Sequence, residues 1–297
     1  MKISKYVIPN SSVVYKPSNP FHATLISSEL LTEEGSPDEV RNIVFDISTS
    51  GIHYIEGQSI GIIPPGNDAQ GKPLKPRLYS IASSRTGDDG KSTTITLCVK
   101  RVNYPDETTG EIIRGPASNY LCDLKPGERA ATIGPNGRRF LLPADDTTDL
   151  IMLAVGTGIA PFRAFVNHIY REKGNWNGKV KLFYGAKTGM EALFMNRRND
   201  DIGQYMTETT FNAFRALSQA KTGDEEKGYV QQKVATHQKE IWDILSNGKF
   251  SLYICGLKGM EQGIEEVLSK LADQQGKNWI EMKKQFLAEG RWNTEVY

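Results

Sequence analysis

The sequence predicts a two-domain protein in which an antiparallel β-barrel precedes an α/β domain with a parallel sheet. Three observations support this fold class. The 297-residue chain is about twice the usual size of one domain. Its first half alternates short apolar segments with turn-forming residues, and its second half alternates continuous apolar runs with helical patterns. We therefore expect domains over residues 1–145 and 146–297.

The first half contains short predicted strands at residues 43–47, 93–99 and 111–114. Explicit turns separate them, such as Pro64-Pro65-Gly66-Asn67 and Asp88-Asp89-Gly90, whose residues fix φ or tolerate a positive φ. Short strands at this spacing favour a small antiparallel barrel.

The second half begins with a continuous apolar run at residues 150–155, which is typical of a strand buried on both faces. A helix should follow, because apolar residues recur at helical spacing from Phe162 to Tyr170 behind Pro161. Further strands are predicted at 180–184, 211–217 and 250–255, and a further helix at 260–271. Strands that alternate with helices imply a parallel sheet.

Composition excludes several classes of function. The net charge of +1 argues against a nucleic-acid-binding protein. The longest apolar stretch, 150–160, is too short to cross a bilayer. Residues 1–5 do not resemble a secretion signal, so we expect a cytoplasmic protein. The three cysteines lie too far apart for a metal or iron–sulfur site, so redox chemistry would need an organic cofactor.

Three segments carry residues suited to nucleotide binding. Residues 156–161 place glycines between a strand and a helix, where a diphosphate commonly binds, although such a turn also serves close packing. Alternation along residues 77–84 puts Arg77 and Tyr79 on one face and Ser80 on the other. Residues 115–121 resemble a phosphate-binding turn that opens a helix.

Together these segments resemble the plant-type ferredoxin–NADP reductases, a family of FAD-containing enzymes from plastids, cyanobacteria and some other bacteria. The resemblance covers residues 15–297 and implies an FAD-binding barrel followed by a Rossmann-like NADP domain. Its most specific motifs, in chain order, are Glu56-Gly57-Gln58-Ser59-Ile60-Gly61-Ile62, Arg77-Leu78-Tyr79-Ser80, Gly156-Thr157-Gly158-Ile159-Ala160-Pro161, Cys255-Gly256-Leu257-Lys258-Gly259-Met260-Glu261 and Trp292-Asn293-Thr294-Glu295-Val296-Tyr297.

The resemblance implies hydride transfer between NADP(H) and FAD. Ser80 would then lie near flavin N5, Cys255 and Glu295 beside the nicotinamide, and Tyr297 on the flavin as a removable gate. Arg77 and Ser118 would hold the FAD diphosphate. Further cofactor contacts are implied at Leu78, Tyr79, Cys98, Val99, Lys100, Tyr104, Ala117, Thr157, Gly158, Gly256 and Leu257.

The resemblance also implies an adenosine site for NADP and a surface for an acidic electron carrier, either ferredoxin or flavodoxin. Gln219 departs from the arginine of most relatives, which puts the strength of the NADP preference in question. Pro116-Ala117 and the stretch 184–188, with Lys187 near the coenzyme, are also atypical. The adenosine-site residues are Ser218, Lys221, Tyr229, Gln231 and Lys233, and the carrier-binding residues are Lys16, Lys72, Lys75, Arg138 and Arg139.

Two other functions share parts of this pattern. A reductase that serves an oxygenase would use the same fold with an added iron–sulfur module, for which this sequence shows no cysteine spacing. A nucleotide-binding module without turnover would lack redox-site residues, whereas Ser80, Cys255, Glu295 and Tyr297 are all present. The sequence also leaves a mature plastid protein open as an alternative to a bacterial one.

Overall fold

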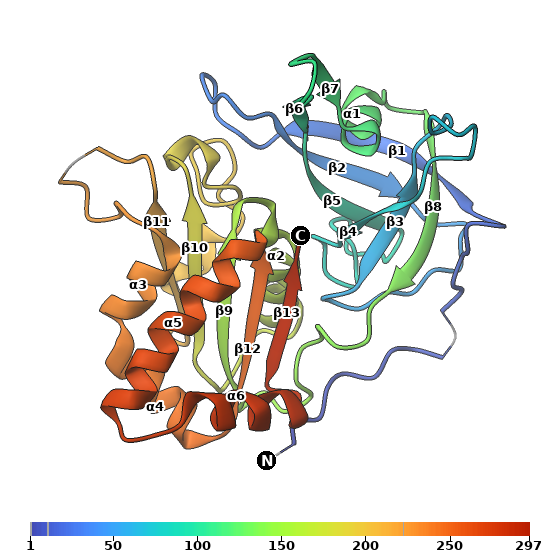
Figure 1. The fold of residues 1–297 in the computed structure, drawn as a ribbon. Coiled ribbons are helices and arrows are strands. Elements are labelled where there is room, and N and C mark those ends of the chain that lie inside the picture. Colours follow the sequence, from blue (N-terminus) through green and yellow to red (C-terminus); the bar gives the residue numbers. More distant parts are fainter. Residues whose placement is uncertain (1, 11, 222) are drawn as a thin grey trace.

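The first sheet of the computed structural model, which describes residues 2–10, 12–221 and 223–297, is an antiparallel barrel (Figure 1). The strand order is β4-β3-β8-β1-β2-β5. A bridge between Ile81 and Leu97 joins the two outer strands and closes the barrel, which confirms the predicted fold. The strands are β1 (Phe21–Leu30), β2 (Val40–Asp46), β3 (Ser59–Ile63), β4 (Arg77–Ser80), β5 (Thr94–Lys100) and β8 (Arg129–Asn136).

Alternating apolar residues fill the barrel, because successive side chains of a strand point to opposite faces. Ile43 and Phe45 of β2 lie in this core with Ile95 and Leu97 of β5. A short ribbon of β6 (Asn103–Pro105) and β7 (Ile112–Arg114) leads into α1 (Pro116–Asp123), which adds Leu121 to the same core. The start of α1 is thereby held at the end of the barrel.

The second sheet consists of parallel strands in the order β11-β10-β9-β12-β13. Because all of them run in one direction, their carboxyl ends meet at one edge of the sheet, and that edge faces the barrel (Figure 1). The strands are β9 (Asp149–Val155), β10 (Val180–Ala186), β11 (Phe211–Leu217), β12 (Phe250–Gly256) and β13 (Trp292–Val296).

Helices cover both faces of this sheet, as the continuous apolar strands require. Ile151 and Leu153 of β9 share a core with the helices α3 to α6, whereas Met152 and Ala154 pack with α2 on the other face. The predicted helix after β9 begins as the 3₁₀ turn η1 (Gly156–Ile159) and ends as the π-helical turn η2 (Asn167–Glu172). The remaining elements are α2 (Ala160–Val166), η3 (Gly189–Glu191), η4 (Gly203–Thr207), α3 (Val230–Thr236), α4 (Gln238–Asn247), α5 (Lys258–Gln274) and α6 (Trp279–Ala288).

The two sheets share apolar and ionic contacts. One core cluster combines Leu31, Cys98 and Phe140 of the barrel side with β9, β10 and α2. Arg163 of α2 is 6% exposed, and its guanidinium pairs with Asp88 and Asp201. A buried cation is tolerated only when it is paired in this way, so Arg163 ties α2 to the barrel. Within the described part of the chain, no helix is long and apolar enough to span a membrane.

Candidate functional site

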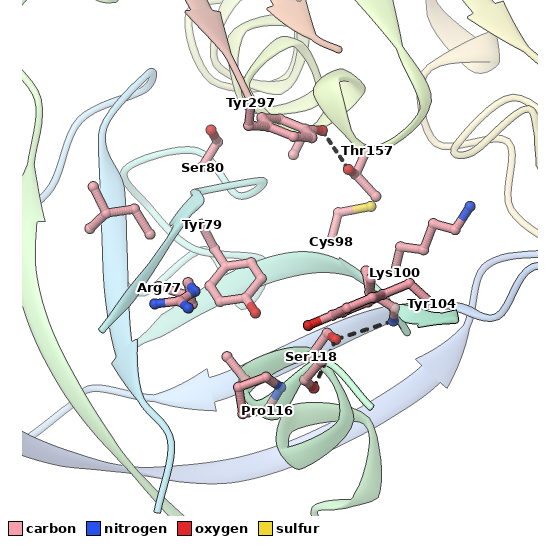
Figure 2. Close-up of a pocket in the computed structure, with 15 residues that line it drawn as sticks. Arg77, Tyr79, Ser80, Cys98, Lys100, Tyr104, Pro116, Ser118, Thr157 and Tyr297 are labelled. Carbon is pink, nitrogen blue, oxygen red and sulfur yellow. Dashed lines mark hydrogen bonds between the residues drawn. The ribbon is translucent and has the colours of Figure 1, made fainter. Parts of the chain in front are cut away.

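A cavity of about 410 Å³ lies between β4, β5 and α1 of the barrel and the start of α2 in the second domain (Figure 2). Both domains therefore build its wall, and most of the predicted FAD-binding residues line it. The lining residues are Arg77, Leu78, Tyr79, Ser80, Cys98, Lys100, Val102, Tyr104, Gly115, Pro116, Ala117, Ser118, Thr157, Ala160 and Tyr297. Val99, Gly158, Gly256 and Leu257 are not among them.

One end of the cavity is suited to a phosphate group. Arg77 is exposed there, and α1 begins beside it with Pro116 in its first turn and no side chain that caps its N–H groups. Free N–H groups at a helix start attract anions. The Ser118 hydroxyl accepts a hydrogen bond from the Val102 N–H at 3.1 Å, and this contact fixes the first turn of α1. These donors fit the diphosphate of a dinucleotide.

Two tyrosines make the cavity suitable for flat rings. Tyr79 and Tyr104 project into it from β4 and β6 (Figure 2). Burial raises the pKa of Tyr79 to about 12, so its ring is neutral at physiological pH. Aromatic side chains bury large flat surfaces against other rings. Hydrogen-bond donors for a phosphate at one end and aromatic rings along the wall together fit FAD.

The glycine turn after β9 comes very close to β12. A Cβ atom built on Gly158 would lie 2.1 Å from the Cys255 carbonyl oxygen, so only glycine permits this approach. The turn η1 therefore lies directly against the ends of β12 and β13. Gly156 has a φ of 56° at the start of the turn, which also favours glycine.

Ser80 of the barrel meets the ends of two parallel strands of the second domain. Cys255 of β12 and Glu295 of β13 stand opposite each other in register. The Ser80 hydroxyl donates a hydrogen bond to Glu295 Oε2 at 3.3 Å. The predicted residues Ser80, Cys255 and Glu295 thus come together from three distant parts of the chain.

Burial shifts the pKa of both groups that face Ser80. Loss of solvent raises the pKa of Glu295 to about 7, and the hydrogen bond from Ser80 offsets part of this shift. Burial also raises the pKa of Cys255, with a further contribution from Glu295. Cys255 is therefore a neutral thiol at physiological pH, and Glu295 carries a proton in a large fraction of molecules.

Tyr297 lies at the rim of the cavity, on the same side as Ser80 and facing Thr157 (Figure 2). Its hydroxyl and that of Thr157 are 2.6 Å apart, so η1 fixes the position of the ring. Burial of the hydroxyl raises its pKa. The residue as a whole is 58% exposed, and it is not part of a core cluster among the described residues.

The residues predicted for an adenosine site lie away from the cavity, at the far end of the same sheet edge. Ser218 follows β11, and its hydroxyl donates to the Ala186 carbonyl at 3.4 Å. Lys233 on α3 donates to the Glu225 carbonyl at 3.0 Å, and Tyr229 at the start of α3 is exposed. Gln231 and Lys221 lie on α3 and on the loop before it. A ligand that touched both these residues and the cluster of Ser80, Cys255 and Glu295 would have to span the sheet from β11 to β13.

The five residues predicted for the carrier surface are all exposed, and their segments meet the two ends of β3. Lys72 and Lys75 lie in the connection between β3 and β4. Arg138 and Arg139 follow β8, which pairs with the opposite end of β3 through Ser59 and Asn136. Lys16 lies next to Tyr15, which bridges to Gly134 of β8.

Sequence reasoning missed the ionic contacts between the domains. Asp38 lies in the acidic segment 33–39, which has the composition of a solvated loop, yet its carboxylate contacts Lys100 and Lys187. Arg163 interrupts an apolar helical run, and a charge in such a run is the signal that could have identified it.

Sequence reasoning also missed a buried network of ion pairs between the segment that precedes β3 and the turn η2. Glu56 pairs with Arg85 at 2.6 Å, and His168 contacts Glu172 at 2.7 Å and Glu56 at 3.6 Å. Burial alone would raise the pKa of Glu172, but the contact to His168 and the hydrogen bonds accepted from Ser84 and Thr86 lower it to about 2. Glu56, His168 and Glu172 are among the types of side chain that bind metals, but here they pair with one another and join η2 to the barrel.

The fold and the cavity define a class of protein: a two-domain, nucleotide-dependent oxidoreductase. The family model described as "Oxidoreductase NAD-binding domain" matches residues 152–266, which include most of the parallel sheet. The ferredoxin–NADP⁺ reductase of Plasmodium falciparum has a similar structure, with a TM-score of 0.75 at 25% identity over 97% of this chain and 100% of that one.

Two relatives are more similar in sequence. The ferredoxin–NADP reductase of Thermosynechococcus vestitus is 44% identical over 96% of this chain and 74% of its own length. The chloroplastic leaf isozyme 1 of ferredoxin–NADP reductase from Arabidopsis thaliana is 42% identical over 95% of this chain and 79% of its own length. The chain belongs to the ferredoxin–NADP reductase family.

Proposed function

We propose that this protein is an FAD-dependent oxidoreductase that transfers hydride between NADP(H) and FAD and single electrons between FAD and ferredoxin or flavodoxin. The observation that carries the proposal is the meeting of Ser80 with Cys255 and Glu295 beside the cavity. Residues of the barrel and of the parallel sheet face each other there, as a reaction between two bound dinucleotides requires.

The barrel residues would hold FAD. We assign Arg77 and the start of α1 around Ala117 and Ser118 to its diphosphate, because a guanidinium and the uncapped N–H groups of a helix start line this end of the cavity. Tyr79 and Tyr104 would lie against its rings, with Leu78 and Cys98 completing the wall, whereas Val99 points into the barrel core. The bound flavin would accept a hydride as an electron pair and release electrons one at a time.

The sheet residues would position the nicotinamide. Cys255 and Gly256 end β12 and Leu257 follows them, and burial keeps the Cys255 thiol neutral, so that it would contact the nicotinamide without a charge of its own. Thr157 and Gly158 would line the approach. Glu295 would hold a proton beside the reacting ring. Tyr297 would leave the rim when the nicotinamide enters, so its ring acts as a gate.

We further propose that the two functional halves meet at residues 145 and 146, between the end of β8 and the start of β9. The 2′-phosphate of NADP(H) would be read by Ser218 and Lys233, with Lys221, Tyr229 and Gln231 around the adenosine. The carrier would dock on the exposed cations of the barrel. For location we propose the cytoplasm, where free buried cysteines such as Cys98, Cys122 and Cys255 are common, and cell fractionation distinguishes it from a plastid.

The test is stopped-flow reduction of the FAD-loaded protein by NADPH. The purified protein should be yellow, and its flavin should be released on denaturation. Cys255→Ala should slow flavin reduction at least about tenfold with little loss of FAD, because positioning acts on the transition state. Cys122→Ala, a buried cysteine of α1 outside the cavity, is the matched control. A colourless protein that does not take up FAD would contradict the proposal.

A further inference from the structure

Asp38 joins two lysines from different domains through one oxygen atom. Its Oδ2 lies 2.6 Å from Lys100 Nζ and 2.7 Å from Lys187 Nζ. Lys100 ends β5 of the barrel, and Lys187 directly follows β10 of the parallel sheet. The Asp38 side chain is 18% exposed, whereas the lysines are 39% and 43% exposed. The carboxylate is thus the inner member and the two ammonium groups face outward.

The segment that carries Asp38 is fixed to the second domain. The Asp38 N–H donates to Ser36 Oγ at 3.1 Å, and Ser36 Oγ donates to Glu191 Oε1 of η3 at 2.8 Å. The Glu33 N–H donates to the Met190 carbonyl at 3.1 Å. Asp38 therefore keeps its place between the lysines through the backbone, independently of the two ion pairs.

The lysines stand midway along the proposed path of the dinucleotide. Lys187 follows β10, which lies between β11, where the adenosine residue Ser218 is found, and β9, where the glycine turn begins. The Gln219 N–H donates to the Lys187 carbonyl at 2.7 Å, which places Lys187 directly beside the adenosine residues. Lys100 lines the cavity at the side away from Arg77 (Figure 2). A dinucleotide that runs from Ser218 to Cys255 must carry its diphosphate past these ammonium groups.

We propose that Asp38 competes with the diphosphate of the nicotinamide dinucleotide for Lys100 and Lys187. This inference rests on the proposed function and adds a residue that regulates the same site. The triad of Lys100, Lys187 and Asp38 carries a net charge of +1, which is one unit less than the lysines alone. The carboxylate weakens coenzyme binding and speeds release, because it takes back both ammonium groups when the diphosphate leaves.

The experiment compares NADP⁺ binding to the FAD-loaded wild type and to Asp38→Asn by titration calorimetry at several salt concentrations. The variant keeps the shape of the side chain and removes its charge. NADP⁺ should bind roughly three- to tenfold more tightly at low salt, since each partly exposed ion pair contributes modestly. This increase in affinity should become smaller as the salt concentration rises, because added ions screen exposed charges. Equal or weaker binding by Asp38→Asn would overturn the proposal.

Two controls separate this effect from a general change in charge. Glu39→Gln makes the same charge change on the neighbouring residue, which pairs with Arg41 and Arg101 instead. It should alter NADP⁺ affinity less than about twofold. Adenosine 2′-monophosphate reaches the proposed adenosine site without a diphosphate, so its affinity should be the same in Asp38→Asn and the wild type. A similar gain in either control would also overturn the proposal.

A second pair of variants tests the same idea without relying on Asp38→Asn alone. Lys187→Gln leaves the triad neutral and should weaken NADP⁺ binding. The double variant Asp38→Asn, Lys187→Gln restores the net charge of +1 and should return the affinity close to that of the wild type. A double variant no better than Lys187→Gln would contradict competition by Asp38.

FAD also contains a diphosphate, and its dissociation distinguishes the two sources. The rate of FAD dissociation on dilution, followed by flavin fluorescence, should be the same in the wild type and in Asp38→Asn. Slower FAD release with unchanged NADP⁺ binding would show that Asp38 competes with the diphosphate of FAD instead. That result would contradict the proposal. If the wild type itself failed to bind NADP⁺, the proposed function would fail instead.

Discussion

The carboxyl of Glu295 is the titratable group at the site whose protonation responds most directly to conditions near neutral pH. Its pKa is raised to about 7 by burial, whereas an unfolded chain has the ordinary value of 4.5. Between pH 4.5 and about pH 7, the Glu295 carboxyl of the folded protein holds a proton that the same carboxyl has lost in the unfolded chain. The free energy of unfolding should therefore fall as pH rises through this window.

Replacement of this group tests the prediction. Glu295→Gln removes the titration, so its free energy of unfolding should fall less between pH 5 and pH 8 than that of the wild type. The difference should be on the order of 2–3 kcal/mol. Urea denaturation of both FAD-loaded proteins at several pH values measures it. Parallel pH profiles for the two proteins would show that the carboxyl is ionised throughout.

Lys233 should determine the preference for NADPH over NADH. A hydrogen bond to a charged group contributes about 1.5–3 kcal/mol, so Lys233→Ala should weaken NADPH binding roughly ten- to a hundredfold and leave NADH nearly unchanged. Gln219→Arg should sharpen the preference, because a guanidinium binds phosphate with two donors. The ratio of kcat/KM for the two coenzymes reports both effects, and equal losses for NADPH and NADH would exclude Lys233 from phosphate recognition.

At the residue scale, the sequence predicted side chains that belong to recognisable motifs. Ser80, Cys255 and Glu295 lie in the motifs that carry the family resemblance, and the structure brings the three together; their roles in the reaction stay predictions. Asp38 could not be predicted in the same way. Its role depends on which lysines of two separate sheets the loop reaches, and an acidic loop segment gives no local signal of that geometry.

At the scale of elements, α2 has two structural roles: it packs against the parallel sheet, and it contacts the barrel. Its apolar residues pack against the sheet, and Arg163 reaches the barrel, where it pairs with Asp88 and donates to the Ala82 carbonyl at 2.9 Å. Ala82 lies two residues after Ser80. The helix that follows the glycine turn therefore also supports the strand that carries Ser80.

Removal of the Arg163 charge should destabilise the protein strongly. Arg163→Met leaves the partly buried carboxylates of Asp88 and Asp201 without their cation, at a cost of about 2–4 kcal/mol. Arg138→Met, an exposed arginine on the barrel, should cost less than about 0.5 kcal/mol. Urea denaturation measures both, and addition of Asp88→Asn and Asp201→Asn should restore part of the loss. A variant as stable as the wild type would mean that α2 does not need this ion pair.

Elements with strong hydrophobic patterns were predicted well. The strands expected at 150–155, 180–184, 211–217 and 250–255 are all present with nearly the expected bounds. The π-helical turn η2 was not predicted, because its apolar residues Ile169 and Tyr170 also fit the spacing of an ordinary α-helix. β13 carries Trp292 and Glu295 but has no apolar run, because it lies at the edge of the sheet.

At the scale of the whole molecule, the exposed cations of the barrel should steer an acidic carrier. The double variant Lys75→Glu, Arg138→Glu should slow electron transfer to ferredoxin roughly three- to tenfold at low salt, because steering raises association rates. The difference should shrink at high salt. Lys239→Glu on α4, far from the barrel (Figure 1), is the control with the same kind of charge change. Equal rates for all proteins at low salt would contradict docking on this surface.

The core cluster shared by the two sheets limits how the protein can be taken apart. Leu31, Cys98 and Phe140 of the barrel side pack in one cluster with Phe165 and Tyr253 of the other. A chimera that joined this barrel to the parallel-sheet domain of a distant relative would bring together two halves of a core that had not evolved in contact. Recombination between the halves should therefore succeed best when the two parents carry the same side chains on both faces of that cluster.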